Sequence, residues 1–487
     1  MEEKKAHIKK LDQNRYIIEK HGNMNVDGII YVNDELFQIL GTDESIKQVE
    51  NVACLPGIVG ASMAMPDIHW GYGFPIGGVA AFDVENGVIS PGGVGYDINC
   101  GIRLLRSGLN VKEIKDKIKD IIDLLYINIP SGVGSHRKDL KLTKEELKKV
   151  LKKGARWAVE NGFGEKEDLE YIEDRGEMEG ADPGCVSDKA FERGKDQLGT
   201  VGSGNHFVEV GYISEIYDKD TAEMFGLFKN QITVMIHTGS RGFGYQVCDD
   251  YIREMIKASE RYGIYLPDRQ LCCAPIESPE GKRYFYAMVA AANYAFANRQ
   301  IITHWVRETF EKIFRTSSKN LNLSLVYDVC HNIAKIEKHT IKEGKREKEM
   351  LVCVHRKGST RSFGLGESVL PEKYRNIGQP VLIPGDMGRA SYVLCGTKKA
   401  MEETFGSTCH GAGRILSRNQ AIKASKGRSI SKEMEEKGII VKASSKTTLV
   451  EEMPEAYKDV SKVVQVVHNA GISRLVAKII PLGCIKG

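Results

Sequence analysis

The segment GGVGYDINCG at residues 92–101 runs directly into a β-rich stretch, GIRLLRS at 101–107. Glycine allows close backbone approach and positive φ, so a tight turn at this point can present side chains. Asp97 and Cys100 stand in the turn, where a carboxylate and a thiolate could share one metal ion. Their spacing alone slightly favours a plainer arrangement, a buried cysteine beside a turn-capping aspartate.

Four further short segments each carry a histidine, and three of them also contain glycine. They are GSGNHFVEV at 202–210, IHTGSRGFG at 236–244, VCHNIAK at 329–335 and CHGAGR at 409–414, which supply His206, His237, His331 and His410. Any one of these histidines alone is more often a structural polar residue than a ligand. Together with the 92–101 turn, they indicate one metallo-phosphoryl site assembled from distant parts of the chain.

The metal-type residues suffice for two ions with positions left open for substrate. The candidate ligands are Asp97, Cys100, His206, His237 and His331. A thiolate can bridge two metals. Sulfur and imidazole donors favour zinc, whereas a carboxylate and open octahedral positions would suit manganese, so the residue types alone lean weakly to zinc.

His410 lies in a different setting. The segment HGAGR offers a nest of backbone N–H groups and Arg414, which together suit phosphate binding. A neutral imidazole there could attack phosphorus and form a phosphoramidate, although a phosphate-binding or structural histidine is the alternative. IPGDMGRASYVL at 383–394 is a second candidate loop for phosphate or base contacts. Arg356, Lys357 and Arg361 could line an RNA groove or could be scattered surface charge.

Composition places the chain among ordinary soluble enzymes. It has 487 residues, 41% hydrophobic and 28% charged, with a formal net charge of +4. Eleven cysteines without a CxxC pair do not suggest a disulfide framework. The charged N-terminus shows no signal-peptide pattern, and no apolar run reaches the ~18 residues of a membrane span. We therefore expect a cytoplasmic protein with no membrane partner.

Periodicity predicts a mixed α and β fold. Strands are expected near 28–32, 76–82, 101–107, 232–237 and 323–331, and helices at 111–125 and 284–315. Residues 65–78 look like a loop. The charged stretch 136–196 is expected to be a helical insertion whose charges form a solvated face. Because candidate site residues run from Asp67 to Lys486, residues 1–487 are expected to form a single catalytic domain.

These motifs, taken in order, resemble the RtcB family of RNA-splicing ligases. The resemblance rests on GGVGYDINCGIRLL, GSGNHFVEV, HTGSRGFG, CHNIAK, HRKGSTRSF, IPGDMGRASYVL, CHGAGR and the IKG ending. It implies the family's own α/β fold with a β-rich core and surrounding helices, not a Rossmann sheet. It also implies a tRNA-splicing and RNA-repair ligase of the long archaeal and eukaryotic type, which joins 2′,3′-cyclic phosphate or 3′-phosphate ends to 5′-hydroxyl ends.

The resemblance further implies GTP and two Mn²⁺ ions as cofactors, in place of zinc. One ion would be held by Asp97, Cys100 and His206. The other would be held by Cys100, His237 and His331. GMP would be attached to His410 and then transferred to the RNA 3′-phosphate. Guanylate contacts are expected from Asn205, His206, Phe207, Val208, Glu209, His331, Asn332, Pro384, Gly385, Asp386, Met387, Ser391, His410, Gly411, Ala412, Gly413 and Lys486.

Implied partners are RNA, as tRNA halves or other broken RNA, and an archease-type activator protein. Asp386 departs from the serine of some family members. The rival hypotheses are a dinuclear metallophosphoesterase, which needs no nucleophilic His410, and an RNA-binding module with vestigial catalysis. A covalent GMP adduct separates the ligase from both.

Overall fold

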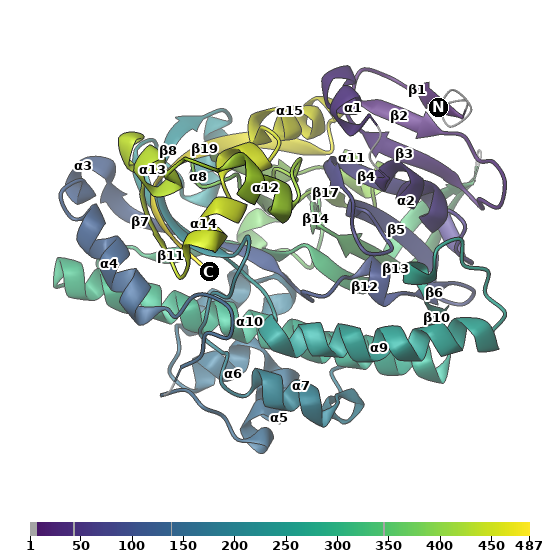
Figure 1. The fold of residues 1–487 in the computed structure, drawn as a ribbon, viewed down its shortest axis with the longest axis horizontal. Coiled ribbons are helices and arrows are strands. Elements are labelled where there is room, and N and C mark those ends of the chain that lie inside the picture. The colour runs from purple at the N-terminus through teal and green to yellow at the C-terminus, as the bar shows by residue number, and fades with distance from the viewer. Residues whose placement is uncertain (1–6, 42–43, 138, 344–345) are drawn as a thin grey trace.

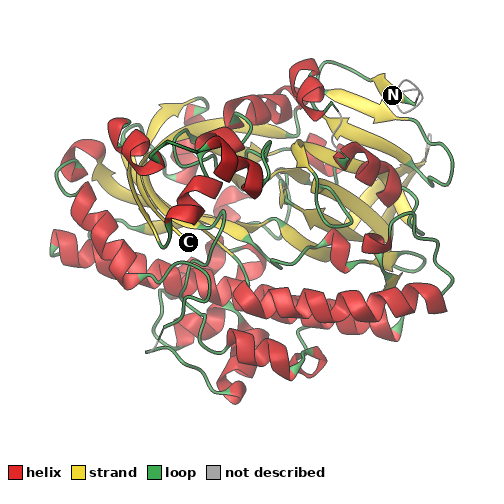
Figure 2. Ribbon diagram, viewed as in Figure 1, coloured by secondary structure: helices red, strands yellow, loops and turns green. Residues whose placement is uncertain are grey.

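Two large, mainly antiparallel sheets and a layer of helices make up the protein (Figures 1 and 2). The computed structural model describes residues 7–41, 44–137, 139–343 and 346–487. In the view of Figure 1, the long helices run below both sheets, and the yellow-green C-terminal helices lie over the upper middle of the molecule. Within these described ranges, no helix combines the length and the apolar character that a membrane crossing requires.

The first sheet joins N-terminal strands to a hairpin from the middle of the chain. The described strands pair in the order β1-β2-β3-β4-β5-β13-β12. Their bounds are β1 Ile8–Lys10, β2 Arg15–Ile18, β3 Asp27–Tyr31, β4 Ile58–His69, β5 Ile76–Asp83, β12 Asn332–Glu343 and β13 Arg346–Lys357. Among these pairs, β3 and β4 are parallel and the others are antiparallel.

Most of the predicted ligand residues lie in the second sheet or next to the ends of its strands. Its described strands follow the order β11-β7-β9-β8-β19-β16-β15, with β18 beside β19. The bounds are β7 Gly101–Asn110, β8 Phe207–Ile216, β9 Gln231–Thr238, β11 Ser324–Cys330, β15 Pro380–Ile383, β16 Ser391–Gly396, β18 Ile440–Ala443 and β19 Ser473–Lys486. Cα atoms of β11 and β15, at the two ends of this order, approach within 8 Å, so the sheet curls on itself. Short ladders β6 (Val88–Ile89) with β10 (Ala274–Pro275) and β14 (Ser359–Arg361) with β17 (Ser407–Cys409) complete the described strands.

Helices cover the sheets and cap the site. Their bounds are α1 Asp34–Leu40, α2 Ser45–Val52, α3 Val111–Ile114, α4 Ile118–Asn128, α5 Lys144–Lys153, α6 Ala155–Glu160, α7 Asp188–Gly194, α8 Lys219–Phe225, α9 Arg241–Arg261, α10 Pro279–Phe314, α11 Lys398–Glu403, α12 Arg418–Ala424, α13 Ile430–Glu436, α14 Lys446–Glu451 and α15 Val460–Ala470. The short 3₁₀ turns are η2 Pro91–Gly93, η3 Lys166–Tyr171, η4 Glu173–Gly176, η5 Pro183–Cys185, η6 Arg269–Leu271, η7 Glu372–Tyr374 and η8 Pro454–Ala456.

Helix α10 is the central support of the molecule. Its first turn begins at Pro279 after the N-cap Ser278, and proline suits this position because it lacks the N–H that a first turn leaves unpaired. Residues around most of its circumference are buried, since α4, α5, α6, α9 and β9 all pack against it (Figure 1). Arg299, in its middle, donates to Asp328 of β11 and to the backbone carbonyls of Asn99 and Thr238. Helix α10 thereby ties together the strand ends that carry the predicted ligands.

The mixed fold with a β-rich core, distinct from a Rossmann sheet, is confirmed, because the described strand pairs are almost all antiparallel. Each predicted strand is present within one to three residues of its expected bounds. Two expectations were wrong. The segment 65–78 is not all loop, because β4 continues to His69. The predicted helix 111–125 is broken between Ile114 and Ile118 into α3 and α4.

The charged region 136–196 contains the helices α5, α6 and α7, and α5 begins with a capping box of Thr143 and Glu146. The expectation that its charges simply form a solvated face fails at two buried carboxylates. Asp168 accepts two hydrogen bonds from Arg307 at 2.6 and 2.7 Å, and Glu173 pairs with Lys335. The region therefore contributes charge partners to the interior.

Candidate active site

Strand register brings the four ligand-type side chains to one edge of the second sheet. Cys330 pairs with Gly101, which pairs with Thr238, and on the next rung His237 pairs with Phe207. Cys100, His206 and His331 each lie one residue from the end of a strand in these ladders. Neighbouring strands β11, β7, β9 and β8 therefore deliver all four side chains to the same place.

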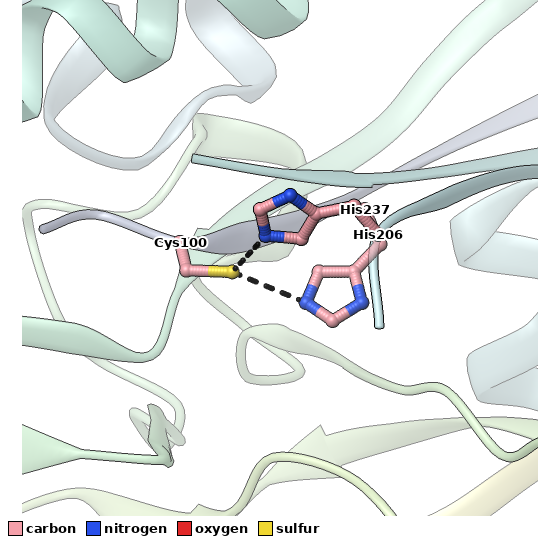
Figure 3. Close-up of side chains that lie close together, drawn as sticks. All are labelled: Cys100, His206 and His237. Atoms are coloured by element: carbon pink, nitrogen blue, oxygen red, sulfur yellow. Dashed lines mark hydrogen bonds between the residues drawn. The ribbon is translucent and has the colours of Figure 1, made fainter. Parts of the chain in front are cut away.

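Cys100 is at the centre of this cluster. Its Sγ atom lies 3.3 Å from Nε2 of His206 and 3.2 Å from Nε2 of His237. Figure 3 shows the sulfur pointing between the two rings, and the ligand atoms of the three residues lie within 4.8 Å of one another. All three residues are buried. Such a set of soft and borderline donors is suited to a transition metal or zinc.

Two more candidates extend the cluster on either side of Cys100. Oδ2 of Asp97 lies 2.8 Å from Nε2 of His206, and Nε2 of His331 lies 3.4 Å from Nε2 of His237. The structure therefore brings all five predicted ligand residues together: Asp97 lies beside His206, His331 lies beside His237, and the Cys100 sulfur lies next to both His206 and His237.

The backbone between Asp97 and Cys100 is held in an unusual conformation. Asn99 has φ of 51°, a left-handed value that asparagine tolerates better than most residues. Its side chain donates to the carbonyl of Ala292 at 2.7 Å and accepts from Arg299 at 3.0 Å. These contacts with α10 fix the turn so that Asp97 and Cys100 face the same histidine.

The electrostatic environment keeps two histidines neutral. Burial lowers the pKa of His237 and of His331 well below the ordinary value, and neighbouring imidazoles lower both further. Burial, and then the charge of Asp97, raise the pKa of the Cys100 thiol. Burial would also raise the pKa of Asp97, but His206, Cys100 and Arg241 hold it below its usual range. A cation at this position would favour the thiolate.

His410 lies beside the cluster and is oriented by Asp67. Its ring centroid is 4.8 Å from that of His331. Nδ1 of His410 lies 2.6 Å from Oδ2 of Asp67, an oxygen that also accepts the backbone N–H groups of His410 (3.0 Å) and Gly411 (3.2 Å). A carboxylate can only accept here, so the neutral imidazole carries its proton on Nδ1 and its lone pair on Nε2.

A cavity of about 330 Å³ connects these groups. This volume falls within the ~300–1,000 Å³ typical of small-molecule sites. Beyond the metal-type residues and His410, the predicted guanylate residues on its wall are Asn205, Phe207, Glu209, Asn332, Pro384, Gly385, Asp386, Met387, Gly411, Ala412, Gly413 and Lys486. Most of the predicted nucleotide site therefore surrounds one space.

Comparison with known proteins agrees with the geometry. Residues 48–487 match the model of a family described as tRNA-splicing ligase RtcB. The chain belongs to this family. It is 56% identical over 464 residues to a tRNA-splicing ligase RtcB of Archaeoglobus fulgidus, with 95% of each chain covered. It is 53% identical over 481 residues to the protein of the same name from Thermococcus kodakarensis, with 99% of each chain covered.

The RtcB family membership confirms the predicted class of enzyme, an RNA ligase. A third relative, from Aeropyrum pernix, is 51% identical over 466 residues, with 95% of this chain and 96% of that protein covered. The relatives and this chain are therefore similar over nearly their whole lengths.

Three of the residues expected to contact guanylate from the RtcB resemblance do not line the cavity: His206, Val208 and Ser391. His206 contacts Cys100 and Asp97, which do line it. Val208 follows Phe207 in β8 and precedes Glu209, so strand alternation turns its side chain into the core between this sheet and α4 and α10. Ser391 lies behind the wall, where it accepts the backbone N–H of Gly385 at 3.2 Å and hydrogen-bonds to Glu209. Ser391 can support the loop and the carboxylate.

Several residues on the wall had no assigned role in the sequence. Tyr72 and Tyr96 line the cavity, as does Glu452, whose buried carboxylate contacts Arg414 at 3.1 Å and Lys486 at 3.7 Å. The sequence feature that could have indicated the two tyrosines is the glycine-rich segment around each of them. Glu452 lies in a polar, lysine-rich part of the chain, and nothing local distinguishes it from surface glutamates.

Proposed function

We propose that this protein joins RNA ends through a covalent histidine–GMP intermediate, using GTP and manganese. The observation that carries the proposal is the position of His410. Its Nδ1–H is bound by a buried carboxylate, its Nε2 has no hydrogen-bond partner among the described residues, and its ring lies next to the His331 ring in the cavity that Cys100 and His237 also line. A nucleophile, its orienting partner and a metal-type cluster are thus in one place.

The donor set fits two divalent ions. Asp97, His206 and Cys100 would hold one, and Cys100, His237 and His331 the other. Among the described residues, the buried Nδ1 atoms of the three histidines have no hydrogen-bond partner, and the Nε2 atoms of all three point toward the cluster. Manganese follows from likeness to the family, since these donors alone would also suit zinc. When bound, the ions would neutralise phosphate oxygens and polarise the reacting phosphorus.

His410 performs the first step. Nε2 attacks the α-phosphorus of GTP, a P–N bond forms, the bond to the β-phosphate oxygen breaks, and pyrophosphate leaves. The imidazole gains positive charge as this happens. Asp67, hydrogen-bonded to Nδ1, stabilises that charge and holds the ring in place.

The remaining steps return His410 to its initial state. A 2′,3′-cyclic end is first opened by water to a 3′-phosphate. An oxygen of that phosphate attacks the phosphorus of the bound GMP, and the P–N electron pair returns to Nε2. The 5′-hydroxyl of the second RNA then attacks the RNA 3′-phosphorus, GMP leaves, and the hydroxyl proton passes to solvent.

The guanylate is proposed to occupy the wall formed by β8, the 384–387 loop and the end of β19. Burial raises the pKa of Glu209 to about 8, so this carboxyl is protonated at neutral pH. Its Oε1 atom is buried and lacks a hydrogen-bond partner among the described residues. A buried polar atom without a partner is costly, and a nucleotide that contacts it removes that cost. Lys486 and Arg414, on the same wall, supply positive charge for phosphates.

The substrate is proposed to be RNA, with tRNA halves the class suggested by the relatives' name, tRNA-splicing ligase RtcB. The same proposal includes an archease-type activator protein as a partner and a cytoplasmic location. The site draws residues from Asp67 to Lys486, which supports one catalytic unit across residues 1–487.

A ligation assay tests the proposal. The purified protein is incubated with one RNA that ends in a 3′-phosphate, a second that begins with a 5′-hydroxyl, Mn²⁺, and either GTP or ATP. The proposal predicts a joined product with GTP, a much smaller yield with ATP, and none with His410→Ala. Removal of the terminal phosphate without joining would instead support the metallophosphoesterase hypothesis.

A further inference from the structure

Three tyrosines form a continuous aromatic surface that leads out of the cavity. Tyr72 and Tyr96 make an edge-to-face contact with ring centroids 5.6 Å apart, and Tyr96 stacks on Tyr245 at 4.8 Å with 25° between ring planes. We call these three residues the tyrosine platform. They come from the loop after β4, the turn that carries Asp97, and the second turn of α9. Three separate elements therefore converge to build it.

The tyrosine platform begins inside the site and ends in solvent. Tyr72 and Tyr96 line the same cavity as Cys100 and His410, and they are not among the proposed guanylate residues. Tyr245 is 45% exposed, so its ring is not explained by core packing. A chain that enters the cavity past this wall would cross the tyrosine platform before it reaches the reacting groups.

The charges around the tyrosine platform suit a polyanion. The guanidinium of Arg193 lies 5.0 Å from the centroid of the Tyr245 ring. Lys357 also lines the cavity, but its Nζ donates to the carbonyls of Tyr72, Phe74 and Gly92 and burial lowers its pKa to about 7, so Arg193 is the cation at the tyrosine platform. The nearest acid on α9, Asp249, is paired with Arg253 at 2.5 Å. Burial raises the pKa of Tyr72 to about 12, so its ring stays neutral at physiological pH.

The tyrosine hydroxyls do not serve an internal network. Within the described parts of the chain, no hydrogen bond joins the hydroxyls of Tyr72, Tyr96 or Tyr245 to another protein group, whereas Tyr251, one turn or more further along α9, donates to the carbonyl of Cys185 at 2.8 Å. A partly exposed cluster of aromatic rings beside a guanidinium has the features that bind single-stranded nucleic acid without sequence preference.

We propose that the tyrosine platform stacks the unpaired bases next to the RNA 3′ end whose phosphate reacts at His410, with Tyr245 as the outermost contact. The inference rests on the proposed function for the identity of the reacting end. Stacking on aromatic faces accepts any base, so one site could position ends of different sequence. The tyrosine platform would thus position the 3′-phosphate without recognising the RNA sequence.

Equilibrium binding tests this inference without catalysis. A short single-stranded RNA that ends in a 3′-phosphate, with 2-aminopurine at its last nucleotides, is titrated with the Mn²⁺-loaded protein in the absence of GTP. Tyr245→Ala removes the outermost ring, and Tyr245→Trp retains an aromatic face. Tyr265→Ala is the matched control, because Tyr265 is 57% exposed and lies beyond the C-terminal end of α9.

The expected result is roughly a 5- to 100-fold weaker binding by Tyr245→Ala, as for the loss of one base–aromatic stack. Tyr245→Trp should retain affinity and quench 2-aminopurine, and Tyr265→Ala should bind as the unaltered protein does. Equal affinity of Tyr245→Ala and the control would overturn the inference. Contact with a partner protein would then be the better explanation of the exposed ring. Labelling of the unaltered protein by GTP, measured in parallel without RNA, reports separately on the proposed function.

Discussion

Oδ2 of Asp67 is 2.6 Å from Nδ1 of His410, although 343 positions separate the two residues in the chain. Asp67 is fully buried in β4, and the same oxygen accepts two backbone N–H groups from the 410–411 turn. Burial would raise the pKa of Asp67, but His410 and Lys458 hold it below the ordinary value. A charged Asp67 fixes both the tautomer and the direction of the proposed nucleophile.

Asp67→Asn should therefore slow the guanylylation of His410 by at least about 100-fold. An amide can donate to Nδ1, which favours the tautomer with its proton on Nε2 and so blocks the attacking atom. The measurement is the rate at which label from α-³²P-GTP becomes covalently bound. Asp188→Asn, at an 87% exposed side chain, is the control and should react at the normal rate. A normal rate for Asp67→Asn would refute the orienting role.

Cys100→Ala should remove more metal than the loss of any one histidine, because its sulfur lies within 3.3 Å of both His206 and His237. His206→Ala should lose about one of two ions, and Cys100→Ala should lose both. Metal content per chain after desalting checks this by mass spectrometry. Cys54→Ala, at a half-buried thiol outside the cluster, should keep both ions. Equal losses in Cys100→Ala and His206→Ala would contradict a shared sulfur.

Glu209 should make the stability of the nucleotide-free protein depend on pH. Its pKa is raised by burial to about 8 from an ordinary 4.5, so the folded state retains a proton that the unfolded state releases between these values. Stability should consequently fall as pH rises from 4.5 to 8 and then level off. Glu209→Gln should flatten this fall, a change of a few degrees in the melting temperature.

Thermal unfolding at pH 5 and pH 8.5 measures the effect. Glu215→Gln is the matched control on the same strand, because its carboxylate is half exposed and pairs with Lys478 at 3.0 Å. The two variants should differ at pH 8.5 and not at pH 5. A Glu209→Gln profile that parallels the unaltered protein would show that this carboxyl titrates normally.

Asp328→Asn should destabilise the fold and loosen the metal turn. Asp328 is fully buried between Arg103 at 2.7 Å and Arg299 at 2.9 Å, so its loss leaves two buried guanidinium groups without a counter-charge. The free energy of unfolding should fall by about 3–5 kcal/mol in urea denaturation. Asp123→Asn, which breaks a partly exposed 2.8 Å pair with Lys442, should cost less than about 1 kcal/mol. Equal costs would argue against a structural role for the buried pair.

Local pattern in the sequence was sufficient for the strands and for the residues that gather around Cys100. Alternating apolar residues predict a strand, and a histidine at its end predicts a side chain directed at a cleft, as found for His237 and His331. What could not be predicted depends on contacts between distant segments. Asp67 lies in a segment expected to be a loop, and its partnership with His410 exists only because β4 and the end of β17 meet.

The same limit applies to the tyrosine platform and to the buried charges. Tyr96 and Tyr245 are ordinary aromatic residues in their own segments, and only tertiary structure stacks them. Glu173 stands in a charged run that looks solvated, yet its side chain is buried. Burial would raise its pKa, but the charges of Arg361 and Lys335 lower it to about 2. The spacing of charged residues in a sequence does not show which of them are buried, because burial depends on how the whole chain folds.

The most direct test of the whole account is covalent labelling of His410. The Mn²⁺-loaded protein is incubated with α-³²P-GTP without RNA and separated on a denaturing gel, with His410→Ala in parallel. The account predicts an acid-labile, base-stable label on the unaltered protein and no label on the variant. An unlabelled protein that contains its metal, or a label that persists in His410→Ala, would contradict the histidine–GMP mechanism.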